Sequence, residues 1–190
     1  MSIEDKIHYW FTRTSSELIY EYAKWYYTTK EWCTDTAAEY NNNTHKIAGI
    51  LSALSVQKEF SQNKRLVKEF LECQSCGHMS SALKKAKLIY NLDDEDIKPD
   101  TIMNILSGRK TRSFYHNIMY PGSSEYLTVD FRMWKYYKED SWEHITPRRY
   151  NVMEKVFNKV ALDNGISVPS LQAICWCITK YDKKSGENKY

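Results

Sequence analysis

Two residues in the middle of the chain could perform covalent chemistry together. Lys110 lies in GRKT and Asp130 lies 20 positions later in VDFRMW, with the turn YPGSS between them. A lysine amine with a depressed pKa can attack an electrophilic carbon and hold it as an imine. A nearby carboxylate can accept its proton and stabilise a cationic transition state. The same pattern also fits a solvated lysine and an aspartate that caps the next helix, so this alternative stays open.

These two residues have to be positioned by helices. Apolar residues recur at intervals of three and four, while glycine and proline are scarce. The pattern predicts one helix over residues 110–119, stopped by Pro121 and Gly122, and another over residues 129–137 with Thr128 as its cap. Asp130 then opens the second helix, where the helix N-terminus stabilises a carboxylate.

The rest of the chain has the same periodicity. Residues 15–33 are predicted to form one helix with Leu18, Tyr22, Trp25, Tyr26 and Trp32 near one face. LDDEDIKPDTIMNILSG is expected to hold two short helical turns, the first broken at a proline and the second ended by a glycine. Only EYLTVDF resembles a strand, and it is too short to build a sheet. We therefore predict an all-α chain of about nine or ten short helices.

Composition limits the class of protein further. The chain has 190 residues and a net charge of +3, so it forms one compact unit or two small lobes and is only mildly basic. No secretory signal and no apolar run of roughly 20 residues is present, so we expect an intracellular, cytoplasmic protein with no membrane contact. An odd number of cysteines, five, favours reduced thiols over a disulfide scaffold.

SGRKTRSFYHNI and LTVDFRMW together resemble the helix-hairpin-helix DNA glycosylase superfamily, the group that contains endonuclease III and the 8-oxoguanine glycosylases. In that family a glycine-rich hairpin leads into G-x-K-[TV], and a V-D motif opens the following helix. Lys110 matches the family's Schiff-base lysine and Asp130 its catalytic aspartate. The resemblance implies that the amine attacks C1′ of a nucleotide and displaces the base while the carboxylate assists.

The resemblance extends upstream and covers residues 45–138. IAGILSALSVQKEFSQNKRLVKEFL is similar to the family's first core helix, and Gln57 matches the glutamine inserted near the flipped-out nucleotide. MSSALKKAKLIYN matches the K-A-x-x-I helix. The implied fold is one compact helical unit, residues 1–190, with two lobes and a central cleft. A core lobe would span residues 45–138, and a terminal lobe would combine residues 1–44 with 139–190.

The hairpin is degenerate. The family reads L-P-G-V-G before the lysine, whereas this chain reads NILSG and keeps only Gly108, whose backbone would approach a DNA phosphate. Arg109 and Arg112 flank Lys110 and are expected to contact phosphates or lower the pKa of Lys110. His116 would read the base or handle a proton, against the simpler alternative of a capped or exposed histidine.

The cysteines raise a metal-binding alternative. CQSCGH supplies Cys73, Cys76 and His78, which is half of a zinc site. Only Cys175 and Cys177 could complete it, and side chains two apart on a helix face different directions. We therefore expect no metal and predict small buried thiols at a helix end. The four-cysteine tail of some endonuclease III relatives is missing, so no iron–sulfur cluster or other cofactor is expected.

The implied activity is that of a monomeric DNA glycosylase acting on double-stranded DNA with a flipped-out nucleotide, in base excision repair or DNA modification. Schiff-base chemistry at Lys110 would add AP lyase activity, whereas a monofunctional enzyme would lack it. A virus-type enzyme that processes modified pyrimidines is a further variant, and it implies a viral origin. A non-catalytic nucleic-acid or protein-binding module on the same fold is the alternative class. A basic face that contacts DNA phosphates is a further possibility from the sequence. It would combine the segment GRKTRSFYH with Lys135, Lys138, Arg148 and Arg149.

Overall fold

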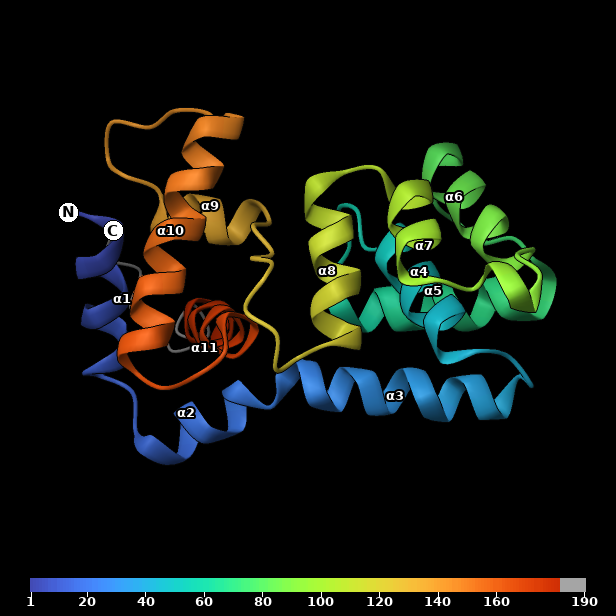
Figure 1. Cartoon of the computed structure of the whole chain (residues 1–190), viewed down its shortest axis with the longest axis horizontal. Helices are drawn as coiled ribbons and strands as arrows, with labels where there is room; N and C mark the ends of the chain where they lie inside the picture. The colour runs from blue at the N-terminus through green and yellow to red at the C-terminus, as the bar shows by residue number, and fades with distance from the viewer. Residues whose placement is uncertain (182–190) are drawn as a thin grey trace. The chain divides into compact units, whose positions relative to one another are not determined.

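The computed structural model describes residues 1–181, and its regular structure is helical (Figure 1). The elements are α1 (Ile3–Phe11), α2 (Ser16–Ala23), α3 (Trp25–Glu39), α4 (Thr44–Leu54), α5 (Phe60–Cys73), α6 (Ser80–Tyr90), the 3₁₀ turn η1 (Asp94–Asp96), α7 (Pro99–Leu106), α8 (Arg109–Met119), α9 (Phe131–Tyr137), α10 (Pro147–Asp163) and α11 (Val168–Tyr181). No strand occurs within residues 1–181, so the all-α prediction is confirmed. No helix in that part of the chain is long and apolar enough to cross a bilayer.

The N-terminal segment contains more helices than expected. Residues 15–33 do not form one helix, because α2 ends at Lys24, whose N–H bonds the Glu21 carbonyl at 3.3 Å in a tighter turn. α1 is an additional helix, started by a capping box between Ser2 and Asp5. The single apolar face predicted for residues 15–33 is therefore wrong, and Leu18 on α2 is exposed.

The described chain divides into two compact units. One comprises residues 1–26 and the chain from Pro121 onward, here named the α11 unit; the other comprises Tyr27–Tyr120, here named the α4 unit. The lobe boundaries expected from sequence, after residues 44 and 138, fall elsewhere. Most of α3 belongs to the α4 unit, where the Lys30 ammonium bonds the Met119 carbonyl at 2.9 Å. α9 belongs to the α11 unit because it packs on α1 and α11.

In the α4 unit the central element is α4. All residues from Ile47 to Leu54 are buried, and α5, α6, α7 and α8 pack against the helix. Gly49 permits a close approach of α6 and α7. A Cβ there would lie 2.9 Å from Ile102 Cγ2 and 3.1 Å from Ile89 Cγ2, so a larger residue would force α6 and α7 away from α4.

In the α11 unit the central element is α11, which contacts α1, α2, α9 and α10. The strand-like segment EYLTVDF is irregular and runs into α9. Tyr150 on α10 supplies the hydrogen bonds that a strand partner would give, because its hydroxyl donates to the Leu127 carbonyl at 2.6 Å and accepts from the Val129 N–H at 3.1 Å. The segment is thereby fixed without a sheet.

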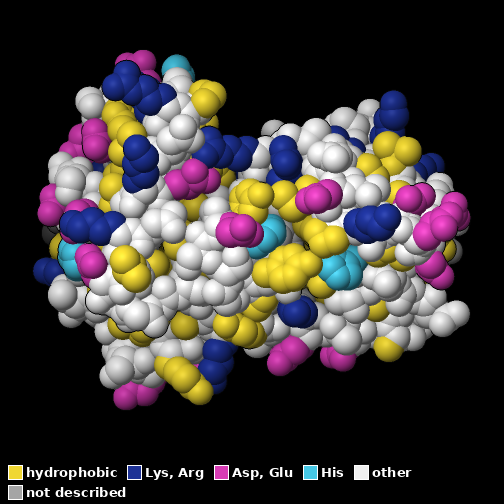
Figure 2. Space-filling model, viewed as in Figure 1, with side chains coloured by type: hydrophobic (Ala, Val, Ile, Leu, Met, Phe, Trp, Pro, Cys, Tyr) yellow, Lys and Arg dark blue, Asp and Glu magenta, His cyan; other side chains and the backbone are white. Residues whose placement is uncertain are grey.

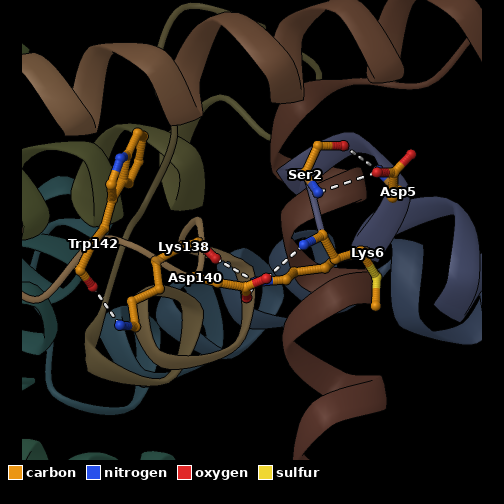
Figure 3. Close-up of polar contacts among 7 residues, drawn as sticks. Ser2, Asp5, Lys6, Lys138, Asp140 and Trp142 are labelled. Carbon is orange, nitrogen blue, oxygen red and sulfur yellow. Dashed lines mark hydrogen bonds and ion pairs between the residues drawn. The ribbon is translucent and has the colours of Figure 1, made fainter.

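The N-terminal helix of this unit is tied to the segment after α9 by charged groups (Figure 3). The Lys6 ammonium bonds the Asp140 carboxylate at 2.9 Å and the Lys138 carbonyl at 2.5 Å. The amino group of Met1 bonds the second Asp140 oxygen at 2.5 Å. Hydrogen bonds from these two ammonium groups lower the pKa of Asp140 to about 2. The Lys138 ammonium bonds the Trp142 carbonyl, which shapes the same loop.

Candidate active site

Lys110 lies in the first turn of α8, and its amine reaches the C-terminal end of α4. Lys110 Nζ donates to the Ser55 carbonyl at 3.2 Å and to the Ser55 hydroxyl at 3.0 Å, and it lies 5.8 Å from the centre of the Phe114 ring. Ser55 is the C-cap of α4. An ammonium is stabilised at this position because the last carbonyls of a helix carry partial negative charge. The side chain is half-buried.

A short turn sets the position of Lys110. Ser107 and Gly108 alone connect α7 to α8. Ser107 adopts φ +57° and ψ −37°, and the Gly108 N–H bonds the Leu106 carbonyl at 2.6 Å, which closes a γ-turn. Lys85 on α6 stabilises the turn, since its ammonium donates to the Leu106 carbonyl at 2.7 Å and to the Ser107 hydroxyl at 2.9 Å. Gly108 has an ordinary extended conformation, with φ −78°, so Ser107 rather than the glycine bears the positive φ.

Gln57 lies in the same part of the α4 unit as Lys110. It follows Ser55 by two residues in the connection between α4 and α5, and it is exposed with φ +56°. Because the Lys110 amine bonds Ser55, the structure brings the lysine to the segment that holds Gln57. Ser55 was not among the residues predicted for the site, although it belongs to the LSVQ segment that contains Gln57.

The other site residues predicted on α8 do not surround the lysine. Arg109, Arg112 and His116 lie three and four positions apart and therefore share one stripe of the helix. Arg112 is two positions from Lys110 and therefore faces a different direction on α8, while its contact with a phosphate or its effect on the pKa of Lys110 stays a prediction. Arg112 Nε is buried without a hydrogen-bond partner in residues 1–181. His116 is buried, with its ring 4.9 Å from that of Tyr120, so the exposed alternative is wrong.

Asp130 is the N-cap of α9, and its carboxylate has two donors from the α11 unit. Oδ1 accepts the Met133 backbone N–H at 2.8 Å, and Oδ2 accepts the Trp176 indole N–H at 3.0 Å. The cap is therefore Asp130 rather than the predicted Thr128, and α9 begins at Phe131. These bonds hold the carboxylate group in a single orientation.

Trp176 was not found from the sequence. It lies on α11, 46 positions from Asp130, and no local pattern links the two residues. Its ring also has cations nearby: Lys180 Nζ lies 4.7 Å and Arg132 Cζ 5.7 Å from it. Arg132 Nη1 donates to the Thr179 carbonyl at 3.5 Å. The surroundings of Asp130 are therefore aromatic and positively charged.

Lys110 belongs to the α4 unit and Asp130 to the α11 unit. Each side chain is fixed within its own unit, Lys110 by Ser55 and Asp130 by Met133 and Trp176. Their convergence on one nucleotide remains a prediction from the sequence.

The thiols differ from expectation at one position. Cys73 ends α5 and is exposed, with its thiol 3.1 Å from the Glu69 carbonyl, so the prediction of a buried thiol there is wrong. Cys76 is half-buried, and burial is the main cause that raises its pKa. Among the described residues, no three His, Cys, Asp or Glu side chains are grouped so that they could hold a metal ion.

The surface charges are mixed on the face shown in Figure 2, where basic and acidic side chains are interspersed. Of the residues proposed for a basic face, Lys138 and Arg149 have local partners. The Lys138 ammonium bonds the Trp142 carbonyl, and Arg149 Nη1 bonds the His144 carbonyl at 2.8 Å. GRKTRSFYH lies in the α4 unit and residues 135–149 in the α11 unit, so one continuous basic face stays a prediction.

The fold and these side chains define an all-α protein of two compact units, each with one candidate reactive group. By its sequence the chain belongs to the family of unknown function DUF7178, whose model matches residues 1–184. No curated protein and no solved structure matches the chain.

Proposed function

We propose that the protein is a DNA glycosylase of the helix-hairpin-helix type, in which Lys110 attacks C1′ of a nucleotide and Asp130 assists. The observation that carries this proposal is the position of the Lys110 amine. It lies on the first turn of α8, directly after a two-residue connection from α7, and bonds Ser55 beside Gln57. The resemblance gives both residues a role at the same nucleotide. Lys110 matches the family's Schiff-base lysine, and Gln57 matches the glutamine inserted near the flipped-out nucleotide.

The chemistry requires the amine to lose a proton before it attacks. Its lone pair then forms a bond to C1′, the N-glycosidic bond breaks, and the base leaves with the bonding electrons and takes up a proton. Opening of the sugar ring gives an imine between Lys110 and C1′, from which β-elimination would break the strand. A fixed carboxylate such as Asp130 would accept the amine proton and stabilise positive charge on the sugar.

The proposed fold is a two-lobed glycosylase with a cleft for the everted nucleotide and α7, Ser107, Gly108 and α8 as a degenerate hairpin. Ser107 and Lys85 support this proposal because they close the turn at the position of the family's glycine-rich hairpin. The substrate would be double-stranded DNA, with a damaged base or, in a virus-type enzyme, a modified pyrimidine as the target.

The test is borohydride trapping on duplexes that carry an abasic site or a panel of modified bases. Wild-type protein should form a covalent adduct that Lys110→Ala abolishes. Asp130→Asn should slow base release by about 10²- to 10⁴-fold, the usual contribution of a positioned proton acceptor. Lys30→Ala is the matched control, because it removes an ammonium of the same unit that also bonds a helix C-terminal carbonyl, that of Met119 at the end of α8.

Two results would contradict parts of this proposal. An adduct that persists in Lys110→Ala, mapped to another lysine by mass spectrometry, would exclude Lys110 as the nucleophile. Base release that depends on Asp130 without any adduct would identify a monofunctional enzyme in which water attacks. If no duplex of the panel gives either an adduct or base release, the glycosylase proposal is refuted.

A non-catalytic binding module is the second candidate, and one observation favours it. The two hydrogen bonds from Lys110 to Ser55 are those of a structural cap on α4. In this case Lys110→Ala would destabilise the protein by roughly 1 kcal/mol and leave nucleic-acid binding unchanged. Urea unfolding and DNA-binding assays on the same variant separate the two candidates.

A further inference from the structure

The outward face of α9 carries aromatic and cationic side chains side by side. Phe131, the first residue of the helix, is 81% exposed, and Lys135, four positions later, is also exposed. Arg132 and Tyr136 form the adjacent stripe and are half-buried. Met133, Trp134 and Tyr137 are buried in the core of the α11 unit, so they fix which face of α9 points outward.

The positive charge near this face is held in place. Arg132 and Lys180 lie close to the Trp176 ring, and Arg132 also bonds the Thr179 carbonyl. α9 itself contains no acidic residue. Its cap, Asp130, has each carboxylate oxygen bonded to an N–H donor. Beyond the helix, Asp140 is paired with Lys6 and the Met1 amino group.

An exposed apolar side chain is not by itself a binding site. Leu162 on α10 is 79% exposed in the same unit and lies next to Asp163. Phe131 differs because it is aromatic and has Lys135 one helical turn away, at about 5–6 Å between Cβ atoms. A π face and a cation at that separation suit a ligand that alternates flat bases with phosphates.

We propose that the outward face of α9 binds a DNA strand, with Phe131 stacked on an unpaired base and Lys135 in contact with a flanking phosphate. This proposal rests on the proposed function and deepens it, since Phe131 directly follows Asp130. Extrusion of a nucleotide leaves an unpaired base and an open step in the duplex. An aromatic side chain beside the carboxylate covers such a base and excludes water from it.

Fluorescence anisotropy of the full chain with a labelled duplex tests this proposal. The duplex carries a stable tetrahydrofuran abasic analogue, which leaves the opposite base unpaired and cannot be turned over. Phe131→Ala should weaken binding about tenfold or more, with an unchanged salt dependence, because stacking involves no counterion release. Phe131→Trp should restore affinity, since any large ring can stack. Lys135→Ala should lower the slope of log K against log salt by about one.

Leu162→Ala is the matched control, since it removes an equally exposed apolar side chain from the same unit and should bind like wild type. The proposal is overturned if Phe131→Ala binds the duplex as wild type does. It is also overturned if Phe131→Ala weakens the binding of inorganic polyphosphate or polyglutamate as much as it weakens the binding of the duplex, because those ligands have no bases. If a Phe131→Leu variant binds with full affinity, apolar contact is sufficient without stacking, and the proposal is overturned.

The binding measurements on the α9 face and the trapping assay test separate proposals. Loss of binding in Phe131→Ala, together with neither base release nor an adduct from the wild-type protein, refutes the glycosylase and keeps the α9 face as a DNA contact. Adduct formation by wild type, with trapping and affinity unchanged in Phe131→Ala, refutes the α9 face and keeps the enzyme.

Discussion

Lys110 and Asp130 are both oriented by partners that the chain itself provides. Lys110 donates to two oxygen atoms of one residue, Ser55, whereas Asp130 accepts from Met133 on its own helix and from Trp176 on another. A charged group with fixed partners loses less orientational freedom when a substrate arrives. The Asp130 carboxylate therefore depends on α11 as much as on α9.

The Trp176 indole should contribute measurably to this orientation. Trp176→Phe keeps an aromatic ring but removes the N–H that Asp130 Oδ2 accepts. We expect a loss of about 1–3 kcal/mol in the free energy of unfolding, because hydrogen bonds to charged groups are stronger than neutral ones. Urea denaturation measures this change, and the yield of trapped adduct should fall with it if Asp130 takes part in the chemistry.

A double-mutant cycle with Asp130→Ala separates the hydrogen bond from lost packing, because alanine leaves the indole N–H without its acceptor. Coupling between the two changes should reach about 0.5–3 kcal/mol, as for residues in direct contact. Strict additivity would mean that the indole acts on stability through its packing contacts, which include Trp25, whose ring centre lies 5.7 Å away.

At the scale of elements, the connection from α7 to α8 determines where Lys110 lies. Ser107 has φ +57°, a conformation that glycine adopts far more readily than other residues. The Lys85 ammonium compensates by bonding the carbonyl and the hydroxyl at the turn. The serine therefore combines an unfavourable backbone conformation with a favourable side-chain hydrogen bond.

Two substitutions at this position separate those effects. Ser107→Ala and Ser107→Gly both remove the hydroxyl, but only glycine relieves the backbone. We expect the glycine variant to exceed the alanine variant by about 1 kcal/mol in the free energy of unfolding. Thermal or urea unfolding measures the difference. Equal stability of the two variants would show that the positive φ carries no strain.

At the scale of the whole molecule, the two units have different titrating groups. In the α4 unit, burial and then the charge of Lys30 lower the pKa of His45, whose Nδ1 lies 2.7 Å from the Tyr115 hydroxyl. Burial and then Lys58 lower the pKa of His78. In the α11 unit the pKa of Asp140 is lowered to about 2.

The units should therefore respond to acid over different ranges. A histidine with a lowered pKa stabilises the folded state above its ordinary value of 6.5, and this contribution is lost as the pH falls below that value. Asp140 keeps its contribution until the pH falls below 3.8. As the pH falls from about 7.5 to about 5, we expect the protection of amides against exchange, relative to their intrinsic rates, to decrease in α4 and α5 more than in α10. Hydrogen-exchange mass spectrometry resolves these helices.

His45→Gln is the control for this pH dependence. Glutamine retains polar atoms near Tyr115 but does not titrate, so the acid-induced change in α4 should become smaller. An unchanged response in this variant would assign the effect to His78 or to another group of the α4 unit.

Local patterns in the sequence were sufficient for most helices. α8 begins at Arg109, one residue before the predicted start, and α10 has the proline at its start and the glycine past its end that the sequence contains. Such features depend on residues within one turn of one another. The division of residues 15–33 into α2 and α3 was missed, because the apolar spacing continues across Lys24 while the backbone tightens there.

Local sequence patterns were enough to predict the helical class, the position of Lys110 at the start of a helix and that of Asp130 at the start of the next. The packing of the helices was needed to show that Ser55 and Trp176 hold these side chains and that Phe131 is exposed. The physical reason is that caps and periodicity act within a few residues of the chain, whereas hydrogen-bond partners and exposure depend on how distant helices pack.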